Sequence, residues 1–336
     1  MLLLVYSAKL ASLQTLGVGG SSMMQKKWWK VGLLGSALVC LAVGMAACGK
    51  SNQSTTANYK PKKLTVEFNP SSNAGKMEAQ AKPMQKMLEK QLHVPVKVTV
   101  ATSGNAMVEA LGSKTADIAF LTPTSYVLGH KNYGIKALLQ ATRYKYAAGN
   151  DENLTETPSD HYYGEIVVKK GGKVKKLSDL KGKKIATQDT TSTAGYVFPA
   201  AELSQKGINI NQDGIKTFTV KGSDQGVLAV YNGNADAAFV FQGARKIAAK
   251  DDPKVMTDTT VLYMTKPIPN DTISVRNDMD PAWNRKITTA FENIAKTKKG
   301  HDLIYQIYGH QGYVAAKDSN FDPVRKNLKI VNQLSK

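Results

Sequence analysis

The same pattern occurs twice in this sequence: LGSKTADIAF (111–120) and NGNADAAF (232–239). In each stretch a glycine precedes Ala-Asp, and a short apolar run then ends near a phenylalanine. Glycine suits the end of a helix, and aspartate suits the turn into a strand. Because Asp117 and Asp236 lie 119 residues apart, the pattern predicts two similar lobes, each with a helix, a turn and a buried strand.

The segments around these stretches alternate between strand and helix patterns. Short β-rich runs predict strands, and longer amphipathic runs predict helices. Pro83 lies inside the first helix and predicts a kink or a break there. The alternation predicts the α/β class, with parallel strands and enough chain for two lobes. The predicted strands are 64–68, 94–100, 117–121, 165–169, 184–187, 216–220 and 237–241, and the predicted helices are 77–92, 107–111, 194–205 and 225–231.

The N-terminal segment has the pattern of a secretory signal. A basic stretch, MMQKKWWK (23–30), precedes an uncharged apolar run at 31–47, and Cys48 follows. A run this short, flanked by lysines and ending in small residues, indicates a signal peptide rather than a membrane span. The ending MAAC (45–48) resembles the lipobox of bacterial lipoproteins, which implies that Cys48 is acylated and begins the mature chain. An ordinary signal peptide with a chance cysteine is the alternative.

We therefore expect residues 1–47 to be an upstream extension and signal peptide, and 48–61 to be the lipidated cysteine and a flexible tether. The tether is polar and has no periodicity. Residues 1–22 fit neither segment, which predicts that translation starts at Met23 or Met24.

The composition disfavours several classes of site. The chain has two cysteines, Cys40 and Cys48, and Cys40 lies in the expected signal, so no disulfide is expected. The net charge of +19 comes from scattered lysines, which suits an anionic surface or a small anionic ligand better than nucleic acid. The five histidines lack zinc-type spacing, and no Walker loop or G-x-S-x-G motif occurs. We therefore expect no enzyme activity, metal, cofactor or nucleic-acid partner.

Three loops are expected to reach a ligand. In two-lobed α/β proteins the ligand lies in a crevice at the carboxyl ends of the strands. The loops that follow predicted strands there are LTPTSY (121–126), QDTTSTAGY (188–196) and FQG (241–243).

Four segments together resemble the PhnD-type family, the phosphate-, phosphite- and phosphonate-binding proteins of ABC importers. The resemblance covers most of 62–310, and its motifs occur in order. They are DIAFLTPTSYVLG (117–129), LSDLKGKKIATQDTTSTAGYVFPA (177–200), NGNADAAFVF (232–241) and IPNDTISVRNDM (268–279).

The resemblance implies the type II periplasmic-binding-protein fold, an α/β fold of two lobes with a ligand cleft between them. The chain would cross between the lobes near 160–167 and return near 266–275. Lobe 1 would then comprise 62–160 and 270–336, including the C-terminal helices, and lobe 2 would comprise 161–269.

The resemblance also implies that hydroxyl side chains bind the ligand. A Ser-Thr-Ser run that holds the oxyanion in this family falls on Ser192, Thr193 and Ala194, and Thr191 could replace the missing third hydroxyl. A helix start offers unpaired N–H groups and the positive end of the helix dipole, and hydroxyls add further donors. The alternative is plain N-capping by Asp189 or a threonine.

The opposite lobe would contribute Thr124, Ser125 and Tyr126, although Tyr126 could instead be a packing residue. Gln242 occupies the position where relatives that bind 2-aminoethylphosphonate carry an acid. A neutral amide suits phosphate, phosphite or a small alkylphosphonate better than a ligand with an amine.

We therefore predict a monomeric solute-binding lipoprotein on the outer face of the bacterial cytoplasmic membrane. It would capture a phosphorus oxyanion and deliver it to an ABC permease. One alternative is a binding protein of the same fold for another small anion, such as a sulfonate, nitrate or a vitamin precursor. The others are an enzyme or a sensor domain on this fold. The cleft loops offer no nucleophile and base, which disfavours the enzyme.

Overall fold

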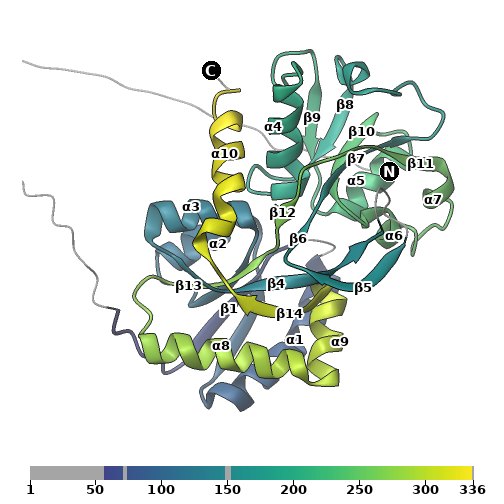
Figure 1. The fold of residues 1–336 in the computed structure, drawn as a ribbon. Coiled ribbons are helices and arrows are strands. Elements are labelled where there is room, and N and C mark those ends of the chain that lie inside the picture. Colours follow the sequence, from purple (N-terminus) through teal and green to yellow (C-terminus); the bar gives the residue numbers. More distant parts are fainter. Residues whose placement is uncertain (1–56, 71–73, 148–152, 335–336) are drawn as a thin grey trace, which may run out of the picture. The chain divides into compact units, whose positions relative to one another are not determined.

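Two β-sheets form the centres of two α/β lobes (Figure 1). The structure is a computed structural model that describes residues 57–70, 74–147 and 153–334. The expected signal peptide, Cys48 and most of the expected tether lie outside these residues. Within the described part of the chain, no helix combines the length and the apolarity needed to cross a bilayer.

The first sheet has seven strands in the order β14-β4-β13-β3-β1-β2, with β5 paired to β4. β1 pairs in parallel with β2 and β3, as the alternation of strands and helices predicts. β13 is antiparallel to its neighbours because it enters this sheet from the other lobe. The strands are β1 (Leu64–Phe68), β2 (Val96–Val100), β3 (Ile118–Leu121), β4 (Lys136–Tyr146), β5 (Leu154–Ser159), β13 (Thr272–Val275) and β14 (His310–Ala315).

The second sheet has five strands in the order β11-β7-β10-β8-β9. β8 pairs in parallel with β9 and β10, whereas β7 is antiparallel to both β10 and β11. Both sheets are therefore mixed rather than purely parallel. The strands are β7 (Gly164–Lys169), β8 (Lys184–Thr187), β9 (Lys216–Thr219), β10 (Ala237–Phe241) and β11 (Thr259–Met264).

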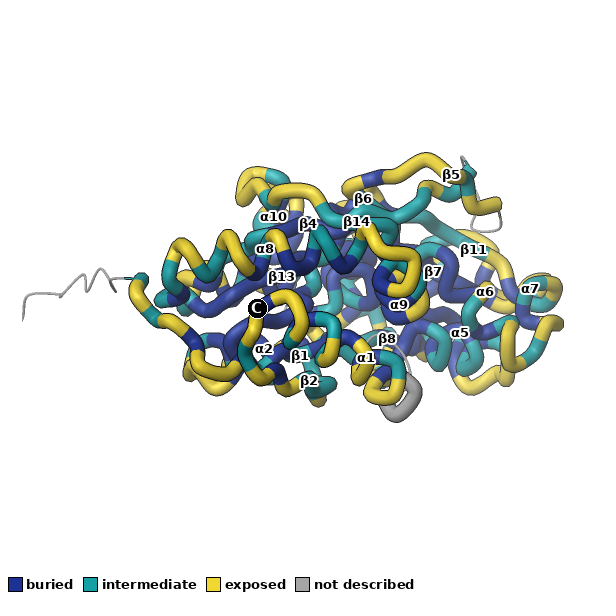
Figure 2. The backbone as a smooth tube through the Cα atoms, turned by 90° about the horizontal axis from the view of Figure 1, so that it is seen from below, coloured by how far each residue is buried: buried dark blue, intermediate teal, exposed yellow. Residues whose placement is uncertain are grey.

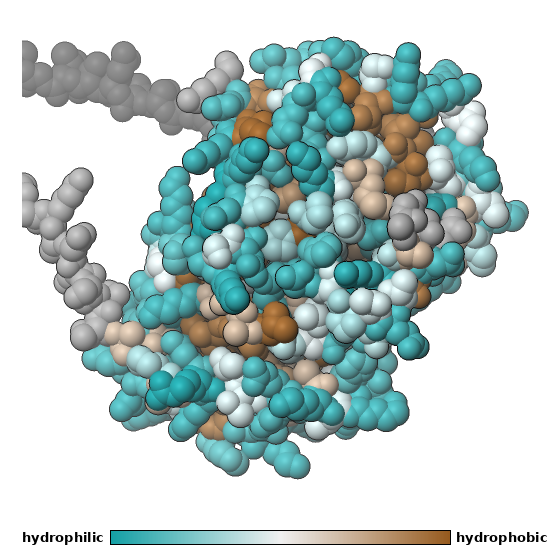
Figure 3. All heavy atoms as spheres, in the orientation of Figure 1, coloured by the Kyte–Doolittle hydropathy of each residue, from teal (hydrophilic) through white to brown (hydrophobic). Residues whose placement is uncertain are grey.

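Helices cover both faces of each sheet, and the central strands are buried (Figure 2). In β3, Ile118 and Phe120 pack into the core beside α1, α8 and α9, while Ala119 and Leu121 pack into the core beside α2 and α3. β10 divides its side chains between two cores in the same way. Hydrophilic residues dominate the face shown in Figure 3. The helices are α1 (Ala74–Leu92), α2 (Gly104–Gly112), α3 (Pro123–Tyr133), α4 (Phe198–Gln205), α5 (Ser223–Tyr231), α6 (Ala244–Ala248), α7 (Val255–Asp258), α8 (Pro281–Lys296), α9 (Lys298–Tyr308) and α10 (Asp322–Val331).

The chain passes between the two sheets twice. The two passages pair as short antiparallel strands, β6 (His161–Tyr162) and β12 (Ile268–Pro269). After them, α8 and α9 pack on the first lobe, but α10 contacts both α3 of the first lobe and α4 of the second. The lobe boundaries at 160/161 and 269/270 remain predictions.

Several details differ from the expectations from sequence; β11, β14 and α3, which begins within the expected loop 121–126, were not predicted. α1 continues through Pro83 without a break. The helix expected at 194–205 begins as a π-type turn, η2 (Thr193–Val197), before α4 starts. β4 and β5 were not predicted, because their sequences mix charged, aromatic and aliphatic residues without a clear alternation.

The repeated Ala-Asp pattern has the same structural role in both lobes. In lobe 1 the Thr65 N–H donates to the Asp117 carboxylate (2.8 Å), and the Asp117 N–H donates to the Thr65 carbonyl (3.0 Å). In lobe 2 the Lys184 N–H donates to the Asp236 carboxylate (2.9 Å), and the Asp236 N–H donates to the Lys184 carbonyl (2.8 Å). Each aspartate thus ties the start of a central strand to its parallel neighbour.

Candidate functional site

Three helix starts converge on one point between the lobes. Ser103 caps α2, Thr122 caps α3 and Ser192 caps η2, and each side-chain oxygen accepts a backbone N–H at 3.1 Å. A Cβ built on Gly104, the first residue of α2, would lie 2.2 Å from Thr191 Oγ1. Each helix start presents N–H groups that have no partner within the helix, so the donors of three elements face one small region.

The loop after β3 and the loop after β8 are hydrogen-bonded to each other. The Thr122 hydroxyl donates to the Thr191 carbonyl (2.9 Å), and the Thr124 N–H donates to Thr193 Oγ1 (3.0 Å). The hydroxyls of Thr124 and Thr193 also lie 2.9 Å apart. These bonds join lobe 1 to lobe 2 directly, so any opening of the lobes must break them.

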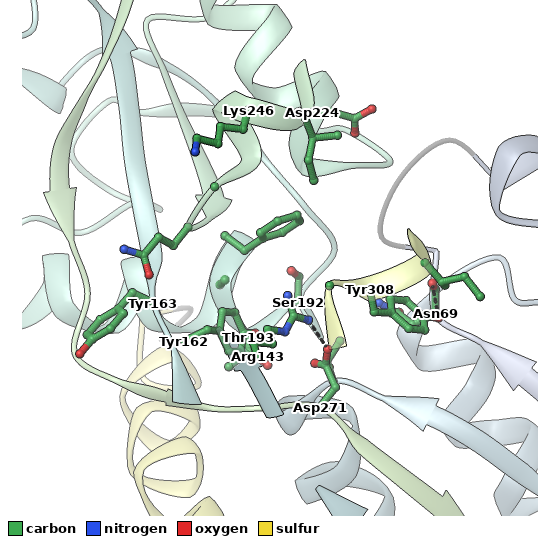
Figure 4. Close-up of a pocket in the computed structure, with 18 of the residues that line it drawn as sticks. Asn69, Arg143, Tyr162, Tyr163, Ser192, Thr193, Asp224, Lys246, Asp271 and Tyr308 are labelled. Carbon is green, nitrogen blue, oxygen red and sulfur yellow. Dashed lines mark hydrogen bonds and ion pairs between the residues drawn. The ribbon is translucent and has the colours of Figure 1, made fainter. Parts of the chain in front are cut away.

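A cavity of about 970 Å³ borders this junction (Figure 4). Four of the expected ligand-binding residues line it: Thr191, Ser192, Thr193 and Gln242. A volume in this range is typical of small-molecule sites.

The other three expected residues do not line this cavity. Thr124 and Ser125 are fully buried in the junction. Tyr126 is also buried; its hydroxyl donates to Asp318 (2.8 Å), and its ring packs edge-on against Phe321 at a centroid distance of 4.7 Å. Burial and the bond to Asp318 raise the pKa of Tyr126. In this structure Tyr126 therefore has the packing role that was the alternative, and its contact with a ligand remains a prediction.

The hydroxyl loop of lobe 2 holds itself in shape. The Ser192 hydroxyl donates to Gln188 Oε1 (2.5 Å), and the Asp189 carboxylate accepts the Thr191 N–H (2.9 Å) and the Thr191 hydroxyl. The helix cap is thus Ser192, whereas Asp189 stabilises the turn before it. A Cβ at Gly195 would lie 2.2 Å from Gln188 Oε1, so a larger residue there would displace the Gln188 side chain from Ser192.

A half-buried charge cluster next to this loop escaped the sequence analysis. Arg143 on β4 pairs with Asp271 (Nη2 to Oδ2, 2.7 Å), and its guanidinium lies 5.0 Å from the centre of the Tyr162 ring. Burial raises the pKa of Tyr162, whose hydroxyl bonds the Thr193 side chain. Although burial alone would raise it, Arg143 and His310 hold the pKa of Asp271 below its ordinary value.

Arg143 was missed because β4 itself was missed. The signal present in the sequence was an arginine within a run that also holds aliphatic and aromatic residues, KALLQATRYKY. Asp271 and Tyr162 lie in or beside the passages between the lobes, so only the tertiary fold brings them to Arg143. Among the described residues, no group of three or more His, Cys, Asp or Glu side chains could hold a metal ion.

Several known proteins are similar to this chain. It is 28% identical over 275 residues to the phosphate-import protein PhnD of Mycolicibacterium smegmatis, which covers 79% of this chain and 83% of that one. It is 21% identical over 286 residues to a probable ABC transporter phosphite binding protein, PhnD1, of Prochlorococcus marinus, with 82% and 91% covered. The solved structure of that organism's PhnD1 in complex with methylphosphonate has a TM-score of 0.69 at 19% identity, with 81% and 99% covered.

A binding protein component of an ABC phosphonate transporter from Pseudomonas aeruginosa also has a TM-score of 0.69, at 16% identity, with 81% of this chain and 87% of that chain covered. These structural similarities confirm the expected two-lobed fold. Residues 66–321, most of the chain, match the family described as "ABC transporter, phosphonate, periplasmic substrate-binding protein". This family consists of substrate-binding transport proteins, and the chain belongs to it.

Proposed function

We propose that this protein captures a phosphorus oxyanion outside the cytoplasmic membrane and delivers it to the permease of an ABC importer. Its ligand would be phosphate, phosphite or a small alkylphosphonate. The observation that carries this proposal is the convergence of three helix starts, with their hydroxyl caps, between two lobes.

Neutral donors suffice for such a ligand. Helix starts bind anions through unpaired N–H groups and the positive end of the dipole. When the lobes open, the bonds from Thr122 to Thr191 and from Thr124 to Thr193 break. The freed hydroxyls and N–H groups would then bind the oxygens of an incoming anion, and closure would surround it with donors from both lobes.

The loop after β10, at 241–243, affects the choice of ligand. Gln242 follows β10 and lines the cavity, and its amide carries no charge. A ligand amine would lack a carboxylate partner at this position. We therefore expect weaker binding of 2-aminoethylphosphonate than of methylphosphonate.

The lipid anchor belongs to the same proposal. Cys48 would hold the mature chain at the outer face of the membrane, and the tether would end near Tyr59. Tyr59 is fixed to lobe 1: its N–H donates to the Asp278 carbonyl (2.9 Å), its carbonyl accepts the Asp280 N–H (3.0 Å), and its ring lies 3.9 Å from the Arg276 guanidinium. A monomer at the end of such a tether could reach a neighbouring permease. Mass spectrometry of the mature N-terminus would test the acylation of Cys48.

Calorimetry tests the choice of ligand. The wild-type protein should bind at least one of phosphate, phosphite and methylphosphonate more tightly than taurine. Removing two cradle hydroxyls in Ser192→Ala/Thr193→Ala should weaken that binding at least 100-fold, because each hydroxyl bond to a charged group contributes about 1.5–3 kcal/mol.

The matched control is Thr217→Ala/Thr219→Ala, which removes two exposed hydroxyls from β9 in the same lobe. It should bind as the wild type does. Tight binding of taurine with none of the phosphorus ligands would instead support the sulfonate alternative and reject the proposal.

A further inference from the structure

We propose that Arg143 is a ligand-binding residue that gives the bound oxyanion a charged hydrogen-bond donor. This inference rests on the proposed function and deepens it: the site would prefer doubly charged phosphorus oxyanions to singly charged sulfonates. The hydroxyl loops alone would offer a neutral cradle.

The position of Arg143 supports this role. Arg143 lines the same cavity as Thr191, Ser192 and Thr193. It is linked to the hydroxyl loop through Tyr162, whose ring lies under the guanidinium and whose hydroxyl bonds the Thr193 side chain. Figure 4 shows the Arg143 side chain between Asp271 and the Ser192–Thr193 turn.

The donors of Arg143 are only partly used. A guanidinium has five N–H donors. Within the described part of the chain, Nη2 bonds Asp271, and Nε is buried with no acceptor. Nη1 has no acceptor among the described residues either and is not buried, and Arg143 lines the cavity. An oxyanion there would supply the missing acceptor.

The surroundings of Arg143 hold it in place before a ligand arrives. Asp271 fixes one edge of the guanidinium, and the Tyr162 ring supports its face. His310 contacts Asp271 from behind (3.5 Å), and burial lowers the pKa of His310 to about 4, so it is neutral near neutral pH. A guanidinium fixed in this way presents Nη1 to a phosphoryl oxygen in a set orientation, which a flexible lysine does not.

The test compares Arg143→Gln and Arg143→Lys with the wild type by calorimetry. The ligands are methylphosphonate, phosphite and methanesulfonate, which has the shape of methylphosphonate. The titrations are run above the second pKa of methylphosphonate, where it carries two charges and methanesulfonate carries one. Arg143→Gln should weaken methylphosphonate binding about 10- to 100-fold, the range expected for one charge-assisted bond. Arg143→Lys should lie between the two. The control is Arg285→Gln on the exposed face of α8, which should bind as the wild type does.

A purely structural role would give a different result. If Arg143 binds the anion, Arg143→Gln should reduce the preference for methylphosphonate over methanesulfonate. Loss of the Arg143–Asp271 pair lowers the melting temperature in either case, so the preference between the two ligands decides the test. Equal losses for both ligands would assign Arg143 to folding and overturn the inference. So would methylphosphonate affinity within twofold of the wild type.

The proposed function fails separately. If the wild type binds none of the phosphorus ligands, the proposed function and this inference both fall. If the wild type binds them and Arg143→Gln does so equally well, only the assignment of Arg143 falls.

Discussion

Asp117 and Asp236 begin equivalent strands in the two lobes, but their surroundings differ. Both form the same pair of bonds to the neighbouring parallel strand. Only Asp117 also forms a buried ion pair, with Arg276 at 3.1 Å, and Arg276 in turn pairs with Asp278 at 2.7 Å. Asp236 is partly exposed, and the residue whose N–H it accepts is the exposed Lys184. The repeated pattern thus sets the local geometry, whereas the tertiary context sets the charge environment.

Ion pairs differ in exposure in the same way. Arg276 with Asp117 and Asp278, and Arg143 with Asp271, have side chains less than one-fifth exposed. Lys181 and Asp213 of lobe 2 form a more exposed pair. Breaking one of the first three pairs should therefore cost more stability than breaking the Lys181–Asp213 pair.

Removing the two aspartates should produce the largest difference. Asp117→Ala removes a strand-start bond and leaves Arg276 buried with one partner fewer, so we expect a loss of about 3 kcal/mol in the free energy of unfolding. Asp236→Ala removes only the exposed strand-start bond, with an expected loss of about 1 kcal/mol. Urea denaturation followed by circular dichroism measures both. Equal losses would contradict the contrast between the lobes.

The difference between the local bonds of Asp117 and its long-range ion pair also shows what could be predicted from the sequence. The LGSKTADIAF and NGNADAAF stretches predicted equivalent helix–turn–strand units, because a C-terminal glycine and a turn aspartate act through local geometry. The same stretches carry no sign that Asp117 meets Arg276, 159 residues further along the chain. Local chemistry could be predicted from sequence, and long-range pairing could not.

The candidate site likewise contains residues that could be predicted from the sequence and residues that could not. The hydroxyl run Thr191 to Thr193 was recognisable because three adjacent hydroxyls precede a helix, and the structure places all three at the cavity. Arg143 and Asp271 were not recognisable, because they lie 128 residues apart and meet only after the chain has crossed between the lobes twice. A search for charged residues inside strands would have found Arg143 together with others such as Glu67 and Glu165, and it would have missed Asp271, which lies between β12 and β13.

Acidification should destabilise lobe 1 through its buried histidine, His310. Burial lowers the pKa of His310 from 6.5 to about 4, so the unfolded chain binds a proton that the folded protein does not. Stability from this residue is therefore present above about pH 6.5 and is lost as the pH falls toward 4. We expect a loss of about 2 kcal/mol between roughly pH 7 and pH 5. The lowered pKa of Asp271 acts in the same direction at lower pH.

Urea denaturation across this pH range measures the effect. In His310→Gln the pH dependence should be shallower, because the group that takes up the proton on unfolding is gone. The control is His301→Gln on α9, which replaces a partly exposed histidine in the same lobe and should keep the wild-type slope. If His310→Gln also keeps that slope, the acid sensitivity has another source.

The smallest expected effect tests the contact between the lobes. Gly104 starts α2, and its φ lies outside the left-handed region, so the backbone accepts alanine. A Cβ there would lie 2.2 Å from Thr191 Oγ1 in lobe 2 and 2.8 Å from Ser125 Oγ in lobe 1. Gly104→Ala should therefore hold the two loops apart and weaken ligand binding about tenfold, which corresponds to about 1.4 kcal/mol.

Two measurements separate this effect from unfolding. Calorimetry should show the weaker binding, while the melting temperature of the ligand-free protein should stay near that of the wild type. The control is Gly312→Ala on β14, where a Cβ would meet only Thr142 Oγ1 at an ordinary 3.7 Å. If Gly104→Ala binds as tightly as Gly312→Ala, closure does not require the close approach of α2 to Thr191. The ligand would then be held by the lobe 2 loop alone, which would make the two lobes less equivalent in function than they are in fold.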